Sequence, residues 1–176
     1  MNTVDKESTT EKAIELLNGL TKLTIDGKEL YHTAAEDIQR PELKDYFYER
    51  SKQCDKAVAA MQEAVRAMGG DPEKSSSVGA RLHRILLEFR NAITYGKGSD
   101  LSVLAEVVRS ERYVLDVFEN KREERSQGLE VDEHGRTAVH WLDRCLEGVR
   151  KNLAEAESLY AKVKADTEKS KAASTK

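Results

Sequence analysis

Apolar residues recur every three or four positions along most of the chain, which is the spacing of one face of an α-helix. No segment alternates with a period of two between turn residues, so the pattern indicates no β-strand. The sequence therefore predicts an all-α protein. The pattern predicts five helices, at about Thr10–Gln39, Pro41–Met68, Val78–Tyr95, Leu101–Arg125 and Glu133–Lys164.

Turn residues separate the predicted helices. Pro41 forces a boundary and then suits the first turn of the second helix, and Gly69-Gly70 is typical of a helix end. The second and fifth helices carry an unbroken alternation of four and three residues, which is typical of a bundle seam. Four long helices and the shorter one at residues 78–95 predict a four-helix bundle, with the shorter helix in a crossover.

The length of 176 residues fits one domain. We expect the helical bundle to cover residues 10–165. The segments 1–9 and 166–176 are polar, and we expect them to be flexible tails.

Composition excludes several classes of protein. The 29 basic and 32 acidic residues are interspersed and give a net charge of −3, which does not favour nucleic-acid binding. No apolar run approaches the roughly 18 residues of a membrane span, so we expect no membrane partner. Cys54 and Cys145 lie in no metal-binding motif and are expected to be small core residues of a reduced, cytoplasmic protein.

Glu111 falls near the middle of the apolar arc of the fourth helix, at about 100° per residue. A bare carboxylate there is costly to bury, so it must be protonated, paired or bound to a cation. Arg50 occupies a seam position of the second helix, and its guanidinium could satisfy both carboxylate oxygens. The main interpretation is a structural ion pair between Glu111 and Arg50 or another base. A metal-binding or catalytic role for Glu111 is the alternative.

Three further residues, two acidic and one glycine, lie on or near the apolar stripes of the predicted helices. Asp26 lies at the edge of the first apolar stripe and is expected to be a helix-surface carboxylate, with metal binding as the alternative. Gly27 lies on the stripe, where glycine costs about 1 kcal/mol relative to alanine, and predicts close approach of a neighbouring helix or side chain. Glu106 lies outside the apolar arc and is expected to be a solvated charge.

Several runs of the chain together resemble an uncharacterised bacterial family of ferritin-like bundles, over roughly residues 14–160. The first helix and the second connection carry most of the likeness, and the last helix is generic. The runs are Leu17-Asn18, Asp26-Gly27, Tyr31, Ala34-Ala35-Glu36-Asp37, Pro41-Glu42-Leu43-Lys44, Phe47, Gly69-Gly70-Asp71-Pro72-Glu73, Ser75-Ser76-Ser77-Val78-Gly79, Leu82-His83-Arg84, Glu106 and Ser110-Glu111.

The resemblance implies a ferritin-like four-helix bundle in a family of unknown function. Ferritin-like proteins with di-iron sites carry a Glu-x-x-His motif on two helices. This chain has no Glu-x-x-His, and Val114 stands three residues after Glu111. The resemblance therefore implies the fold, and the metal chemistry does not follow from it.

The residues contain no nucleophile–base arrangement, glycine-rich phosphate loop or paired Cys-x-x-Cys. The leading hypothesis is a non-catalytic bundle without a cofactor that acts through self-association or binding of a protein partner, although catalysis stays open. A second reason for this hypothesis is that the apolar arc of the fourth helix is wider than one seam, so a second surface of this helix is expected to be covered. The residues that widen it are Val103, Val107, Val114 and Phe118. The alternative is a ferritin-like metal-binding protein or oxidase that holds iron or manganese through Glu111 and Asp26, or through a soft ligand such as Cys54.

Overall fold

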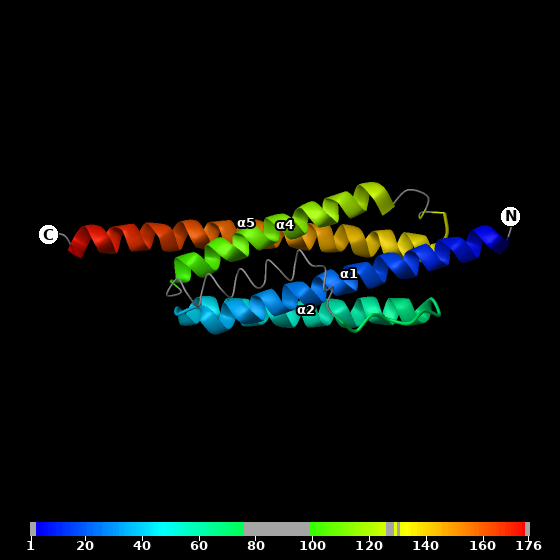
Figure 1. Ribbon diagram of the computed structural model, residues 1–176, viewed down its shortest axis with the longest axis horizontal. Coiled ribbons are helices and arrows are strands. Elements are labelled where there is room, and N and C mark those ends of the chain that lie inside the picture. Colours follow the sequence, from blue (N-terminus) through cyan, green and yellow to red (C-terminus); the bar gives the residue numbers. More distant parts are fainter. Residues whose placement is uncertain (1–2, 76–98, 126–128, 130, 175–176) are drawn as a thin grey trace.

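The computed structural model describes residues 3–75, 99–125, 129 and 131–174, and these residues form long helices with no strand among them. The all-α prediction is therefore confirmed for this part of the chain. The shorter helix expected at residues 78–95 lies outside it. The described helices are α1 (Thr3–Asp37), α2 (Pro41–Ala67), α4 (Asp100–Arg125) and α5 (Glu133–Ser174), shown in Figure 1.

Helix boundaries agree with the apolar pattern where a turn residue marks them. α2 begins at Pro41, whose fixed φ suits a first helical turn, and ends shortly before Gly69, whose φ is 81°. α1 and α5 have no such signal at their outer ends and are longer than predicted, since α1 begins at Thr3 and α5 ends at Ser174. Both segments expected to be tails thus contain helical residues, and their flexibility stays a prediction.

The corner between α1 and α2 is tied to two other helices. The backbone N–H of Gln39 donates to Oδ1 of Asp100 over 2.6 Å, at the start of α4. Arg40 forms ion pairs with Asp100 over 3.3 Å and with Asp166 of α5 over 3.0 Å. The beginning of α4 and the C-terminal part of α5 therefore lie at the same end of the bundle as this corner.

The opposite end of the bundle joins the start of α1 to the start of α5. There, Oγ1 of Thr10 and Nδ1 of His134 are hydrogen-bonded over 3.0 Å. It follows that α1 and α5 run in one direction and α2 and α4 in the other, as Figure 1 shows. The connection from α2 to α4 consequently joins opposite ends of the bundle.

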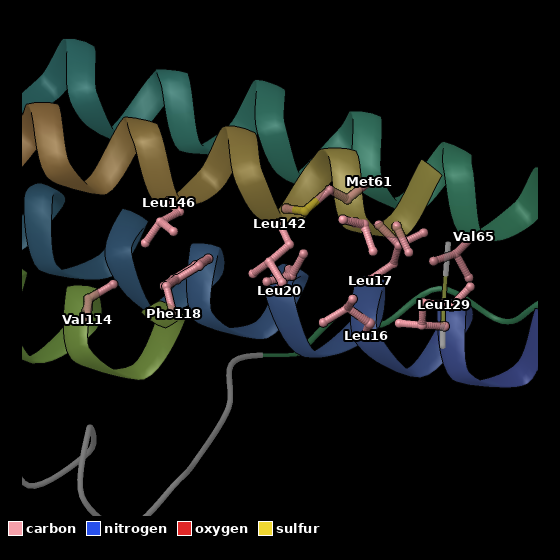
Figure 2. Packing of buried hydrophobic residues seen from close by; sticks show 13 residues of the cluster. Leu16, Leu17, Leu20, Met61, Val65, Val114, Phe118, Leu129, Leu142 and Leu146 are labelled. Carbon is pink, nitrogen blue, oxygen red and sulfur yellow. The ribbon is translucent and has the colours of Figure 1, made fainter. Parts of the chain in front are cut away.

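The core consists of two apolar clusters, one toward each end of the bundle. The first, which we call the corner cluster, includes Tyr31, Phe47 and Leu104 and lies toward the α1–α2 corner. The second, which we call the far cluster, joins residues of all four described helices with Leu129. Figure 2 shows its side chains, among them Leu20 and Met61, meeting between the helices.

Large apolar side chains of the described residues are almost all covered within this single chain. Val131, which is 62% exposed, is the exception among them. The four residues thought to widen the arc of α4 beyond one seam all belong to the core, so the motive they gave for self-association was wrong. They are Val103, Val107, Val114 and Phe118, each 9% exposed or less.

No helix in the described part of the chain is both long enough and apolar enough to cross a membrane.

The chain that follows α2 is held against α1 by one amide side chain. Nδ2 of Asn18 donates to the carbonyl of Asp71 over 3.0 Å, and Oδ1 of Asn18 accepts from the backbone N–H of Glu73 over 2.8 Å. Glu73 also forms an ion pair with Lys22 over 2.8 Å. Two backbone groups of the Gly69–Glu73 run that carries part of the family resemblance, the carbonyl of Asp71 and the N–H of Glu73, are therefore satisfied by α1.

Candidate functional site

Glu111 of α4 is buried, with 4% of its surface exposed. It lies on the same face of α4 as Val107 and Val114, three or four residues away in each direction, and that face is covered by the bundle. The hydroxyl of Tyr31, on α1, donates a hydrogen bond to Oε1 of Glu111. A neutral donor 80 residues away in the sequence thus satisfies one of the two carboxyl oxygens.

Arg50 makes its ion pair with a different carboxylate. Its guanidinium contacts Glu155 of α5, donates to Gln53 over 3.0 Å and lies 5.2 Å from the ring centroid of Tyr46. The ion pair suggested for Arg50 and Glu111 is therefore replaced by two separate interactions. Arg50 acts on Glu111 only through its charge, which lowers the pKa of that carboxyl group.

Two other acidic residues are less exposed than the sequence suggested. Asp26, expected on the helix surface, is 3% exposed, because α1 packs against α2, α4 and α5 and so buries more than one stripe. Glu106, expected to be solvated, has a side chain that is 19% exposed and an ion pair with Arg109 over 2.5 Å. A pattern drawn from apolar residues alone underestimates the covered width of a helix with three neighbours.

The proposed metal ligands do not gather into a site. In residues 3–75, 99–125, 129 and 131–174, no group of three or more histidine, cysteine, aspartate or glutamate side chains is placed to hold a metal ion. Glu111 has the Tyr31 hydroxyl as a hydrogen-bond donor. The described residues thus do not fit the iron or manganese site considered as an alternative.

A cavity of about 250 Å³ lies beside Glu111. α1 packs directly against the other three described helices and α4 packs against α5, whereas α2 has little direct contact with α4 or α5. The cavity lies in the space that this arrangement leaves open between α2 and the α4–α5 pair. Its lining comes from four stretches: α1 between Leu23 and Tyr31, α2 between Arg50 and Ala57, α4 between Glu111 and Phe118, and α5 between Trp141 and Asn152.

Two helical glycines face this cavity. A Cβ atom added to Gly27 of α1 or to Gly148 of α5 would meet no atom within 4 Å. The close approach expected at Gly27 is therefore absent, and that expectation was wrong. Each glycine costs its helix about 1 kcal/mol relative to alanine, and what it provides here is space inside the bundle.

Burial favours the neutral forms of the carboxyl and thiol groups that line the cavity. Burial raises the pKa of Glu111 to about 7, although the Tyr31 hydrogen bond and the Arg50 charge oppose this rise. Burial raises the pKa of the Cys54 thiol to about 12 and that of the Cys145 thiol to about 11. Because the thiolate is the reactive form of cysteine, both residues are inert thiols near neutral pH.

A tryptophan in the cavity lining can report ligand binding through its fluorescence. Trp141 lines it and is the single tryptophan of the chain. The guanidinium carbon of Arg144 lies 5.3 Å from the centroid of the Trp141 ring, and Arg144 is exposed, so the cavity reaches the surface there. The cavity was not predicted from the sequence, where its signals were Gly27, which was assigned to close packing, and a second mid-helix glycine at residue 148.

Comparison with known families gives one match. Residues 12–124 match the family model described as a domain of unknown function, DUF2383. No curated protein matches the chain. The matched range covers most of α1, all of α2 and nearly all of α4, and includes Asp26, Arg50 and Glu111, whereas all of α5 lies beyond it.

Proposed function

The chain belongs to the DUF2383 family of unknown function, and from its cavity we propose that it is a ferritin-like bundle that binds a small, largely apolar ligand without transforming it. The observation that carries this proposal is the open space at Gly27 and Gly148. Two mid-helix glycines that face one cavity lower helix stability and preserve room for a molecule. A cavity lined mainly by apolar side chains, with a few polar groups, is the usual form of a ligand site.

The direction of the helices supports the ferritin-like part of the proposal. α1 and α2 run antiparallel, α2 and α4 run parallel, and α4 and α5 run antiparallel, with one long connection between α2 and α4. One long crossover within a four-helix bundle is the connectivity of ferritin-like folds. The bacterial family that the chain resembles carries the same implication.

The state of the polar groups supports binding in place of catalysis. Both cavity cysteines are protonated near neutral pH because burial raises the pKa of each thiol. Free thiols also suit a reducing compartment, so a cytoplasmic location is part of the proposal. Self-association and binding of a protein partner, expected from the sequence, stay predictions that gel filtration with light scattering can test.

The test uses the fluorescence of Trp141. The purified protein is titrated with phenethyl alcohol, a neutral probe with one aromatic ring, and we expect a saturable change in Trp141 emission. Gly148→Leu fills the space beside α5 and should abolish the change, while Lys151→Leu, on an exposed face of α5, should leave it intact. A linear, unsaturable response that is equal in all three proteins would refute a ligand cavity.

A further inference from the structure

One carboxyl group lies among mostly apolar neighbours in the cavity. Oε1 of Glu111 accepts the hydrogen bond of Tyr31, and Oε2 receives no hydrogen bond from the residues that the structure describes. A carboxylate that is 4% exposed and has one neutral donor is costly to ionise. The cavity therefore presents an acceptor that a bound molecule can satisfy.

The two cations of the cavity lining leave this acceptor unsatisfied. Arg50 is engaged by Glu155 and Gln53, and its side chain is 14% exposed. Arg144 is exposed at the rim and lies over the ring of Trp141. Neither arginine forms an ion pair with Glu111, so the negative charge of the ionised carboxylate has no direct cationic partner in the described residues.

The volume of the cavity limits the size of a ligand. At about 250 Å³ it exceeds the roughly 150 Å³ of an engineered cavity that binds benzene, and it falls below the range of about 300–1,000 Å³ for drug-sized molecules. A single aromatic ring with a short side chain fits these bounds. Phe118 and Trp141 supply aromatic surface for such a ring.

Resting on the proposed function, we infer that the ligand is a small arylalkyl amine, with its ammonium group on Glu111 and its ring in the apolar space beside Gly27 and Gly148. The ammonium group supplies hydrogen-bond donors for the carboxylate and the positive charge that would pair with it. Charge-assisted hydrogen bonds are stronger than neutral ones, so the ion pair sets the preference for an amine over a neutral molecule of equal size.

An anionic ligand is the competing arrangement. Its head group would contact Arg144 at the rim, where an exposed ion pair contributes little, and Glu111 would repel it. The chemistry of the cavity interior therefore favours the amine.

The experiment compares three probes with the same ring, namely phenethylamine, phenethyl alcohol and phenylacetate, titrated into the full chain at pH 8 and followed by Trp141 fluorescence and calorimetry. We expect phenethylamine to bind about tenfold or more tightly than phenethyl alcohol, as a hydrogen bond to a charged group predicts. Phenylacetate should bind most weakly.

Variants separate the role of Glu111 from that of the cavity. Glu111→Gln should remove the preference for phenethylamine and leave the affinity for phenethyl alcohol within about threefold, since the shape is kept. Glu119→Gln removes an α4 carboxylate that is 48% exposed and paired with Arg150, and it should change neither affinity. Thermal melts and far-ultraviolet circular dichroism confirm that each variant is folded.

The wild-type protein provides a second measurement that needs no variant. The ionisable groups lining the cavity are Glu111, Tyr31, Cys54, Cys145, Arg50 and Arg144. Burial raises the pKa values of both thiols and of the tyrosine beyond the neutral range, which leaves Glu111, with its pKa of about 7, as the group that titrates between pH 5.5 and 8. Phenethylamine should bind about fivefold or more tightly at pH 8 than at pH 5.5.

The titrations distinguish failure of the amine assignment from failure of the proposed function. Equal affinities for the amine and the alcohol, or a preference of the Glu111→Gln protein for the amine, overturn the amine assignment and leave a neutral-ligand cavity. Tighter binding of phenylacetate overturns it in favour of an anionic ligand. Saturable binding of none of the three probes overturns both this inference and the proposed function.

Discussion

The two apolar clusters of the bundle differ from the layer between them. The corner cluster and the far cluster are filled by fully buried side chains such as Phe47 and Leu20. The layer between them contains the cavity and two glycines, and Glu111 accepts a hydrogen bond there from Tyr31 of the corner cluster. We therefore expect the stability of this protein to come mainly from the two ends of its core, with the cavity in the layer between them.

The difference shows how a helical bundle can hold a site without losing its fold. Protein cores are packed at the density of organic crystals, and a gap of this size forfeits contacts on all of its walls. The helices remain in register because the clusters on both sides of the gap fix them. Three kinds of substitution test this division between the clusters and the layer that holds the cavity.

The largest effect is expected from Phe47 in the corner cluster. Phe47→Ala should lower the free energy of unfolding by about 3–5 kcal/mol, because a fully buried aromatic side chain leaves a void. Leu23→Ala, at the half-buried wall of the cavity, should cost only about 1 kcal/mol, since it enlarges a space that already exists. Urea denaturation measures both values, and equal costs would contradict the division.

The second effect concerns the pH dependence of stability. The folded-state pKa of Glu111, about 7, is above its usual 4.5, so the folded protein binds this proton more tightly than the unfolded chain does. The stabilising contribution of the protonated form is complete below pH 4.5 and is lost as the pH rises through 7. The loss amounts to roughly 3 kcal/mol at 1.36 kcal/mol per pH unit.

Glu111→Gln should remove this part of the pH dependence. The amide stays neutral and can still accept the Tyr31 hydrogen bond, so the variant should be more stable than the wild type at pH 8.5 and similar to it at pH 4.5. Glu119→Gln is the exposed control on the same helix. Urea titrations at the two pH values measure the difference, and parallel curves for Glu111→Gln and the wild type would show that Glu111 is hydrated.

The smallest effect is expected from the glycines. Gly27→Ala and Gly148→Ala should each raise the free energy of unfolding by about 1 kcal/mol, because alanine is the better helix former and its Cβ meets open space. Gly70→Ala is the contrast, since its Cβ would lie 2.9 Å from two side-chain carbons of Ile14 and should destabilise by about 1–3 kcal/mol. Thermal melts rank the three variants, and a loss of stability at Gly27 or Gly148 would mean that their surroundings are closed.

Sequence reasoning identified what depends on local spacing. The period of apolar residues placed Glu111 on the buried face of α4, and Pro41 and Gly69 marked the ends of α2, because helical phase and turn residues act over a few positions. The donor to Glu111 could not be found in this way. Tyr31 lies 80 residues earlier and meets Glu111 only through the packing of α1 on α4.

The cavity was beyond prediction for a related reason. It results from the small direct contact of α2 with α4 and α5, which no single helix encodes. Gly27 was noticed as costly but was assigned to close packing, because one sequence does not distinguish a glycine that admits a neighbour from one that leaves space. The burial of Asp26 was missed because α1 is covered on more sides than its apolar stripe suggests.

The pairing of the first and last helices has a consequence for how the chain folds. α1 and α2 can form a hairpin from local contacts, but the contacts with α5 join residues as far apart as Thr10 of α1 and His134, or Arg40 of the α1–α2 corner and Asp166. Such distant contacts raise the contact order and slow the search for the native state relative to a bundle of sequential hairpins. During synthesis, the far cluster is complete only once Leu142 and Leu146 of α5 have been made, so part of the apolar surface of α1 and α2 stays uncovered until then.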